Sequence, residues 1–135
     1  MKLSPFIIEF PKIGNPVDGF ISVAEKQDLP FEVKRIYWTY FTPESIIRGG
    51  HAHHRLEQIL IAVSGKIVVT TKCPGWKEEQ LFVLESANKG LYIPRYCWHK
   101  MEYSHNAVQV CIANIDYDES EYIRDYEEFR KLDPQ

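Results

Sequence analysis

The stretch "QILIAVSGKIVVTT", Gln58–Thr71, decides the fold class. Two runs rich in β-branched residues flank Ser64-Gly65, a pair that favours a tight hairpin between neighbouring strands. A second turn signal follows at Pro74-Gly75, which fits the central pair of a type II turn. Both signals predict adjacent antiparallel strands around this stretch.

Working outward, the same kind of pattern extends from Phe6 to Tyr117. Short apolar or alternating runs are separated by turn residues, and no helical period lies between them. Many short strands at regular spacing are typical of an antiparallel sandwich or barrel. We therefore expect an all-β fold, with residues 1–135 forming one domain.

The end of the chain differs from the rest. The segment "DESEYIRDYEEFRKL" opens with Asp118 three residues before Glu121, a capping-box arrangement. A helical period then places Tyr122, Tyr126 and Phe129 on one face. The pattern predicts a C-terminal helix over about 119–132 that packs on the barrel or on a partner subunit.

Composition narrows the class of function. The net charge is -3 and no long run of one sign occurs, so charge gives no case for nucleic acid or an anionic membrane as a partner. No segment approaches the roughly 18 apolar residues of a membrane span. The three cysteines, Cys73, Cys97 and Cys111, are widely separated and never in CxxC, which favours reduced thiols. We expect a cytoplasmic protein.

A histidine cluster is the strongest chemical signal. The stretch "RGGHAHHRLEQ", Arg48 to Gln58, holds three of the chain's five histidines. On a strand, the period of two puts His51 and His53 on one side and sends Ala52 and His54 to the other. In a small barrel the common side can be the interior. The HxH spacing alone fits a metal site, an acid–base site or exposed histidines.

The surrounding spacing is similar to the first signature of the cupin barrels, G-x5-H-x-H-x3/4-E-x6-G. Six residues separate Gln58 from Gly65, so Gln58 stands where metal-binding cupins carry the ligand glutamate. Glu57 is one residue off and would face the opposite side of the strand. The second cupin signature has a loose counterpart in "GLYIPRYCWH", which predicts that His99 reaches the same cavity.

Two chemistries follow from this cluster. In the first, His51, His53, His99 and the neutral Gln58 surround a divalent ion, although an amide in place of a carboxylate weakens such a site. In the second, the imidazoles transfer protons without a metal, because their unperturbed pKa near 6.5 suits neutral pH. Gln58 favours the second, so we expect no metal and no cofactor.

The segments "RIYWTYFTPESIIRGGHAHHRLEQILIAVSGKIVV" and "DYDESEYIRDYEEF" resemble the sugar 3,4-ketoisomerases, a cupin family that acts on dTDP-4-keto-6-deoxyglucose in deoxyamino-sugar pathways. The resemblance covers nearly the whole chain. It rests on Arg48, Gly49, His51, Ala52 and His53, the Gln58 to Gly65 spacing, the run Gly90 to Trp98, and the tail Tyr117 to Ser120.

This resemblance implies a metal-independent homodimer in which paired histidines move a proton between neighbouring sugar carbons. The cupin family adds the jelly-roll topology to the expected barrel. Two departures stand out: His54 replaces the lysine that usually follows His-Ala-His, and "PRYCWH" differs from the Pro-Pro and Trp pattern of relatives. His54 should face away from the pair, whereas the second departure alters the wall that faces the sugar.

The reaction assigns roles to single residues. Moving the ketone from carbon 4 to carbon 3 requires a base at carbon 3, an enediol or enediolate, and proton delivery to carbon 4. We expect His51 to be the base and His53 its orienting partner or a second proton carrier. Tyr37 would donate to a sugar oxygen, and Arg48 would hold the pyrophosphate or polarise the ketone.

Structural roles compete with several of these assignments. Tyr37 lies in "RIYWTY", where aromatic packing is the default, and Arg48 could pair with a carboxylate. Gln58 and His99 are expected to contact the substrate, or His99 to form only part of the cavity wall. Trp98 is expected to pack, and Arg124 to form ion pairs at the surface.

Three other functions remain open on the sequence alone. One is a metal-dependent cupin enzyme, and another is a nucleotide-sugar epimerase that moves a proton at carbon 5. The third is a non-catalytic sugar-binding module that kept the barrel.

Overall fold

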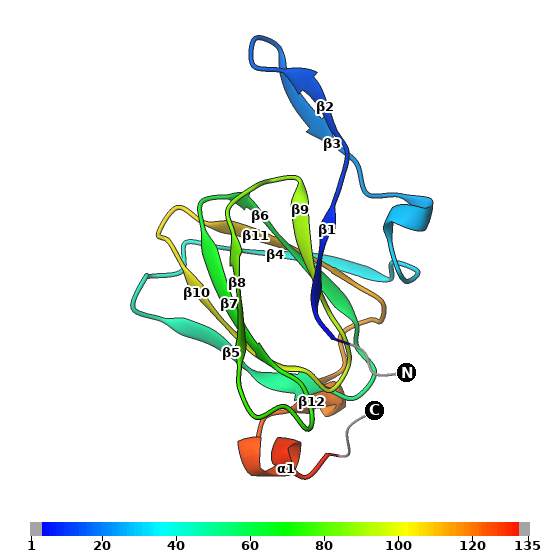
Figure 1. The fold of residues 1–135 in the computed structure, drawn as a ribbon, viewed down its shortest axis with the longest axis vertical. Helices are drawn as coiled ribbons and strands as arrows, with labels where there is room; N and C mark the ends of the chain where they lie inside the picture. The colour runs from blue at the N-terminus through cyan, green and yellow to red at the C-terminus, as the bar shows by residue number, and fades with distance from the viewer. Residues whose placement is uncertain (1–3, 133–135) are drawn as a thin grey trace.

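The computed structural model describes residues 4–132 (Figure 1). Within that range strands dominate, and they run in chain order as β1 (Phe6–Glu9), β2 (Lys12–Asn15), β3 (Gly19–Ser22), β4 (Arg35–Tyr40), β5 (Ile47–His53), β6 (Gln58–Ser64), β7 (Ile67–Lys72), β8 (Gln80–Leu84), β9 (Lys89–Ile93), β10 (Trp98–Tyr103), β11 (Val108–Ala113) and β12 (Tyr122–Ile123). The helical elements are η1 (Lys26–Asp28), η2 (Glu119–Glu121) and α1 (Tyr126–Arg130).

Two five-stranded antiparallel sheets form the barrel. Their strand orders are β1-β9-β6-β11-β4 and β12-β5-β10-β7-β8, and the hairpin β2-β3 extends away from the barrel in Figure 1. The inward side chains of both sheets form the largest core cluster, to which Leu60 and Leu91 contribute from one sheet and Val69 and Leu84 from the other. The predicted all-β cupin jelly roll with a short C-terminal helix is confirmed.

The alternation along β6 explains why its first five residues, Gln58 to Ala62, are all buried. Leu60 points into the core between the sheets, whereas Ile59 and Ile61 pack against a second cluster with Phe10 and Tyr92 on the outer face. A strand covered on both faces reads as a continuous apolar run, as this one does.

The turn predicted at Ser64-Gly65 does not join paired strands. β6 and β7 belong to different sheets, so this turn carries the chain from one sheet to the other. Gly65 has φ +72, and a Cβ there would lie 2.6 Å from the Ala107 Cα. The expectation of a hairpin is therefore wrong, because a turn signal reports the local backbone and not the strand with which its neighbours pair.

The turn at Pro74-Gly75 is confirmed. β7 and β8 pair antiparallel on either side of it. The Trp76 amide donates to the Cys73 carbonyl at 3.1 Å, and Gly75 has φ +84. That geometry is a type II turn with proline and glycine at its centre.

The C-terminal helix is much shorter than 119–132. Tyr122 lies in β12 and pairs with His53 of β5, so it does not share a helical face with Tyr126 and Phe129. Asp125 accepts a hydrogen bond from the Glu127 amide and caps the N-terminus of α1. Phe129 packs with the barrel, as expected for this helix.

The expected capping box at the start of this segment is only half formed. Asp118 accepts from the Ser120 amide and caps η2, a single 3-10 turn. The Glu121 carboxylate turns instead to the backbone amides of Arg55 and Leu56. These long-range bonds compete with the local pattern that the sequence suggested.

All three cysteines are buried and form no disulfide. Within residues 4–132, the helices are too short and too polar to cross a membrane.

Candidate active site

A cavity of about 230 Å³ opens in the barrel, and strands from both sheets line it. Among its polar lining residues are Arg35, Tyr37, Arg48, His51, Gln58, His99 and Tyr122. The site residues predicted from the sequence therefore converge on one place, with His53 immediately behind His51.

The histidine pair lies on one side of β5. The ring centroids of His51 and His53 are 4.8 Å apart, and that of His99 is 4.9 Å from His51. Ala52 points the other way into the core against Ile123 and Phe129. The alternation predicted for HAH is confirmed.

Glycine lets β5 approach β10 closely at this point. Gly49 has φ +87, and a Cβ there would lie 2.9 Å from the His99 carbonyl oxygen. The pairing register shifts between His99 and Lys100, and His51 faces His99 across the two strands. The glycine before the histidine block therefore allows the strand contact that brings His51 and His99 together.

Gln58 is buried beside His99, and its amide orders the neighbouring groups. The His99 Nδ1 lies 3.0 Å from the Cys97 carbonyl, which can only accept, so Nδ1 carries the hydrogen. The unprotonated His99 Nε2 then accepts from the Gln58 amide at 3.0 Å. Gln58 Oε1 accepts from the Tyr37 hydroxyl and from the Cys111 thiol, each at 3.2 Å.

Glu57 faces the opposite side of β6, as predicted. Its carboxylate accepts hydrogen bonds from the Tyr92 hydroxyl and the Asn114 amide, both outside the cavity. The count that placed Gln58 rather than Glu57 in the cavity is confirmed.

The three clustered histidines are neutral at pH 7. Burial, with a smaller contribution from the nearby His99, lowers the pKa of His51 to about 3 and that of His53 to about 2. Burial also lowers the pKa of His99 to about 4. Among residues 4–132, the Nδ1 atoms of His51 and His53 are buried without a hydrogen-bond partner. Each ring is therefore in the neutral form that a general base requires.

Tyr37 and Arg48 line the cavity at different depths. The Tyr37 hydroxyl points at Gln58, and burial raises its pKa, so the phenol stays protonated and able to donate. Arg48 lies on an exposed part of β5. Between residues 4 and 132, the carboxylates form their ion pairs with other cations and leave the Arg48 guanidinium to the cavity.

Sequence reasoning missed Arg35 and Tyr122. Arg35 lies two residues before Tyr37 on β4, and its guanidinium is 5.1 Å from the centroid of the Tyr37 ring. Its Nε is buried and has no hydrogen-bond partner within residues 4–132. The two-residue period of a strand, counted back from Tyr37, would have placed Arg35 on the same side of β4. Tyr122 has its ring centroid 4.9 Å from that of His51 and 4.6 Å from that of His53. The helix expected over 119–132 placed Tyr122 on one face with Tyr126 and Phe129, so its position beside the histidines was not predicted.

Trp98 and Arg124 were expected to lie outside the site, and the structure bears this out fully for Trp98 and in part for Arg124. Trp98 packs against Tyr126 and Phe129, as expected. Arg124 forms the expected surface ion pair with Glu119 at 3.0 Å, but its guanidinium also lies 4.2 Å above the Tyr122 ring.

A metal is a poor match for these donors. The side-chain nitrogens of His51, His53 and His99 lie within 4.8 Å of one another, which is close enough to suggest a metal cluster. However, His99 Nε2 already accepts from Gln58, and the donor set contains no carboxylate to offset a dication's charge. The arrangement suits proton transfer between carbon atoms of a bound ligand.

The two sheets and the histidine cluster in the cavity between them are those of a cupin-type barrel. Residues 4–133 match the family model "FdtA: WxcM-like, C-terminal", and the chain belongs to this family. It is 34% identical over 126 residues to a TDP-4-oxo-6-deoxy-alpha-D-glucose-3,4-oxoisomerase from Aneurinibacillus thermoaerophilus, covering 93% of this chain and 89% of the relative. The family resemblance inferred from the sequence is confirmed.

Solved structures agree in fold. A histidine-to-asparagine mutant of the 3,4-ketoisomerase QdtA from Thermoanaerobacterium thermosaccharolyticum, in complex with TDP-4-keto-6-deoxyglucose, has a TM-score of 0.88 and 31% identity, covering 96% of this chain and 94% of that one. The 4-keto-6-deoxy sugar epimerase NovW from Streptomyces spheroides matches with a TM-score of 0.75 at 13% identity, covering 90% and 68%. The second likeness concerns the fold alone.

Proposed function

We propose that the protein is an isomerase, a nucleotide-sugar 3,4-ketoisomerase that converts dTDP-4-keto-6-deoxyglucose to a dTDP-3-keto-6-deoxyhexose in deoxysugar biosynthesis. The observation that carries the proposal is the neutral His51 and His53 pair, 4.8 Å apart at the cavity, in a chain of the FdtA family. The reaction needs no redox cofactor, because the ketone is reduced and the neighbouring alcohol oxidised within one molecule.

The cavity size supports a sugar ring as the buried part of the ligand. Its volume of about 230 Å³ lies below the range of about 300–1,000 Å³ that encloses a drug-sized molecule. The hexose enters the barrel, and the nucleotide remains at the mouth.

In the proposed mechanism His51, which lines the cavity, removes the proton from carbon 3. His53 lies behind it and holds the ring or takes the proton onward. Because both imidazoles are neutral before substrate binds, the base is ready at pH 7. The proton returns to carbon 4 as the enediolate collapses.

Four further residues are proposed to bind the substrate. The Tyr37 hydroxyl donates its hydrogen to Gln58 and therefore meets a sugar hydroxyl as an acceptor, and Arg48 binds the pyrophosphate or the ketone. Gln58 and His99 form the inner wall, where the hydrogen bond between them holds the Gln58 amide in place and leaves its second hydrogen for the sugar.

The test is proton NMR of dTDP-4-keto-6-deoxyglucose with chelator-treated protein in deuterated water. Loss of the carbon 3 proton signal and growth of a 3-keto product support the proposal. Exchange at carbon 5 instead would indicate an epimerase. Binding without any exchange or product would contradict an enzymatic function and favour a sugar-binding module.

A second candidate, a metal-dependent enzyme, is favoured by one observation, the cluster of His51, His53 and His99 nitrogens. Activity that disappears with chelator and returns with one equivalent of a divalent ion would establish it. Metal analysis of protein purified without a histidine tag gives an independent readout.

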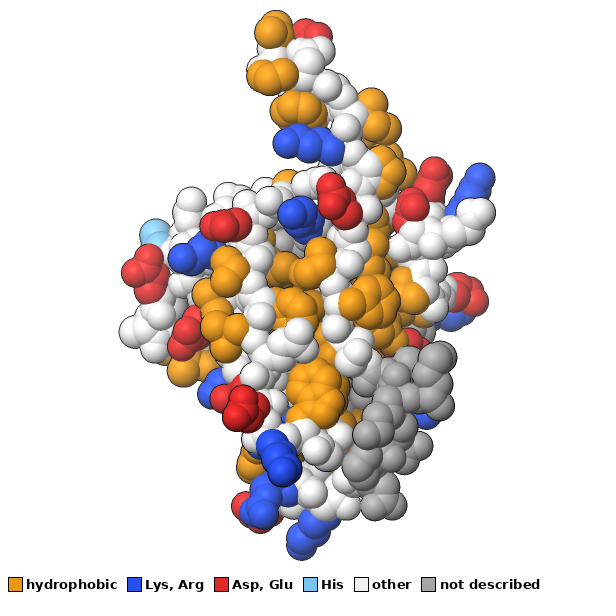
Figure 2. All heavy atoms as spheres, in the orientation of Figure 1, with side chains coloured by type: hydrophobic (Ala, Val, Ile, Leu, Met, Phe, Trp, Pro, Cys, Tyr) orange, Lys and Arg blue, Asp and Glu red, His pale blue; other side chains and the backbone are white. Residues whose placement is uncertain are grey.

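We also propose that the protein is a homodimer. The hairpin carries exposed apolar side chains such as Ile13, Phe20 and Ile21, and Figure 2 shows hydrophobic side chains along the hairpin and over the front of the barrel. The edge strand β4 exposes Trp38, and among residues 4–132 it pairs only with β11, so its outer side is unpaired there. Light scattering should give twice the mass of the chain, and Trp38→Asp should yield monomers. The cytoplasmic location, without nucleic-acid or membrane partners, stays a prediction.

A further inference from the structure

We propose that Tyr122 is a catalytic residue whose hydroxyl transfers the proton between the two sugar oxygens, and that Glu121 is the residue that positions it. This inference rests on the ketoisomerase function proposed above. It assigns a step that the histidine pair does not perform.

The reaction moves two hydrogens. When the base takes the carbon 3 proton, the electron pair of that C–H bond forms the C3=C4 double bond, and the C4=O π pair moves to oxygen 4. When the O–H bond at oxygen 3 breaks, C3=O forms and the C=C pair takes a proton at carbon 4. The hydrogen lost from oxygen 3 thus balances the one gained by oxygen 4. No external oxidant or reductant is needed.

The oxygen-to-oxygen transfer needs its own group. The two oxygens are on neighbouring carbons, so one hydroxyl can donate to oxygen 4 while it accepts from oxygen 3. A phenol both donates and accepts through a single atom. Since the histidines are occupied with the carbon-bound proton, a tyrosine at the cavity is the natural candidate.

Three tyrosines line the cavity, and two of them are engaged. The Tyr37 hydroxyl donates to Gln58 at 3.2 Å, and the Tyr103 hydroxyl donates to Gln109 at 3.1 Å. Among residues 4–132, the Tyr122 hydroxyl has no hydrogen-bond partner, and it is not among the buried orphaned atoms. It is therefore free to bond with a ligand in the cavity.

The Tyr122 ring is well placed for this role. It meets the rings of His51 and His53 edge to face, with interplanar angles of 74° and 67°. On another side the Arg124 guanidinium lies 4.2 Å from its centroid, and Arg124 is itself held by Glu119. The position of the ring is thus fixed by packing and by a cation–π contact. No hydrogen bond of the hydroxyl is needed to hold the ring in place.

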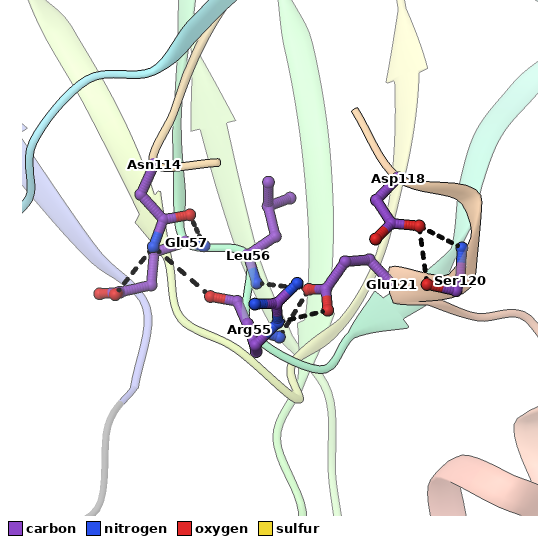
Figure 3. Close-up of polar contacts among 7 residues, drawn as sticks. All are labelled: Arg55, Leu56, Glu57, Asn114, Asp118, Ser120 and Glu121. Carbon is purple, nitrogen blue, oxygen red and sulfur yellow. Dashed lines mark hydrogen bonds and ion pairs between the residues drawn. The ribbon is translucent and has the colours of Figure 1, made fainter. Parts of the chain in front are cut away.

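The backbone that carries Tyr122 is fixed by Glu121. β12 has only two residues, so its pairing with β5 is too short to hold the segment alone. Figure 3 shows the Glu121 carboxylate accepting from the Arg55 amide at 2.7 Å, the Leu56 amide at 2.9 Å and the Arg55 Nε at 3.0 Å. Its carbonyl accepts from the His54 amide at 3.1 Å.

This set of bonds joins two distant parts of the chain. The connection between β5 and β6 follows directly on the histidine pair, and Glu121 directly precedes Tyr122. Only 5% of Glu121 is exposed, so its carboxylate bonds are protected from water. Glu121 lies outside the cavity lining and acts through Tyr122.

The first test is Tyr122→Phe, which keeps the ring, the cation–π contact and the strand pairing. Its matched control is Tyr126→Phe, four residues on, whose hydroxyl accepts from Lys72 outside the cavity. We expect kcat of Tyr122→Phe to fall about 100-fold, within the 10²–10⁴-fold range of general acid–base catalysis, with KM changed less than about threefold. Tyr126→Phe should match the wild type.

Exchange separates the two proton transfers. In deuterated water Tyr122→Phe should still exchange the carbon 3 proton while product formation falls. A kcat within about threefold of wild type would overturn the role of Tyr122. Loss of exchange in the same proportion as product would overturn its assignment to the oxygen-to-oxygen step.

The second test is a double-mutant cycle with Glu121→Gln. Alone, this variant should lower kcat about tenfold in protein that remains folded by circular dichroism. Combined with Tyr122→Phe it should lower kcat no further, because its effect passes through the lost hydroxyl. Additive losses would show a general structural role and overturn positioning. Wild-type protein without any turnover would reject the ketoisomerase function itself, whereas wild-type turnover with unaffected variants rejects only this inference.

Discussion

Gln58 and His99 share a buried hydrogen bond of 3.0 Å, with the amide as donor and the imidazole as acceptor. A glutamate at this position would offer His99 a negative charge, which would favour the protonated ring and provide a metal ligand. The amide instead keeps the site neutral. On the proposed function, this difference of one side-chain atom is what favours proton transfer over metal binding.

Gln58→Glu should therefore create a metal site from the existing histidines. We expect the variant to bind one equivalent of Zn²⁺ at least about tenfold more tightly than the wild type, since the carboxylate adds charge and a strong donor. Isothermal titration calorimetry with zinc chloride measures both the stoichiometry and the affinity of zinc binding. Gln58→Ala serves as the control that removes the amide without adding charge. Equal zinc affinity in all three proteins would contradict the argument.

His51→Asn should abolish turnover and leave the barrel folded. The side chain lines the cavity, and loss of a general base lowers rates by about 10²–10⁴-fold. The matched control is His54→Asn, because His54 contacts Tyr96 rather than the cavity histidines. Its kcat should stay within about twofold of wild type. Full activity in His51→Asn would remove His51 from the mechanism.

The free energy of unfolding should fall as the pH drops below 6.5. The pKa of His51 is about 3 and that of His53 about 2 in the folded state, so the unfolded chain binds more protons below its own pKa near 6.5. Stability is thus fully present above pH 6.5 and is lost toward acid pH, by up to about 1.4 kcal/mol per pH unit for each histidine. Urea unfolding between pH 7 and pH 5 measures this slope.

The double variant His51→Asn, His53→Asn provides the control for that slope. It lacks two of the three cavity histidines that take up protons on unfolding and keeps only His99, so its stability should change less over the same interval. An unchanged slope would mean that other groups account for the pH dependence.

Gly49→Ala should destabilise the protein more than Gly50→Ala. Both glycines have positive φ, but a Cβ at Gly49 would lie 2.9 Å from the His99 carbonyl oxygen, whereas one at Gly50 meets nothing within 4 Å. Left-handed backbone costs about 1–2 kcal/mol for an alanine, and Gly49→Ala adds a steric clash with the backbone. Denaturant unfolding of both variants measures the difference. Equal losses would show that the close approach of β5 and β10 is unimportant.

Local periodicity in the sequence was enough to predict the barrel and the inner face of β5. The alternation of His51, Ala52 and His53, and the count that reached Gln58, depend only on which side of a strand each residue occupies. A period of two fixes that side wherever one face is buried. The same rule would have found Arg35, two residues before Tyr37.

The errors arose where pairing between distant segments decided the outcome. Ser64-Gly65 has the residues of a turn, but which strands pair around it depends on the whole sheet. Tyr122 fits a helical period with Tyr126, yet the carboxylate of Glu121 finds better partners in the β5–β6 connection. Long-range hydrogen bonds overrode the local preference in this segment.

The two-residue strand β12 has a consequence for how the protein loses activity. Tyr122 belongs to a segment that adds little to the main core, so this segment can detach while the other strands of both sheets stay paired. At low denaturant, turnover should disappear before the tryptophan and far-ultraviolet signals of unfolding change. Activity in this protein then reports on the attachment of the segment from Glu119 to Arg130 rather than on the integrity of the barrel.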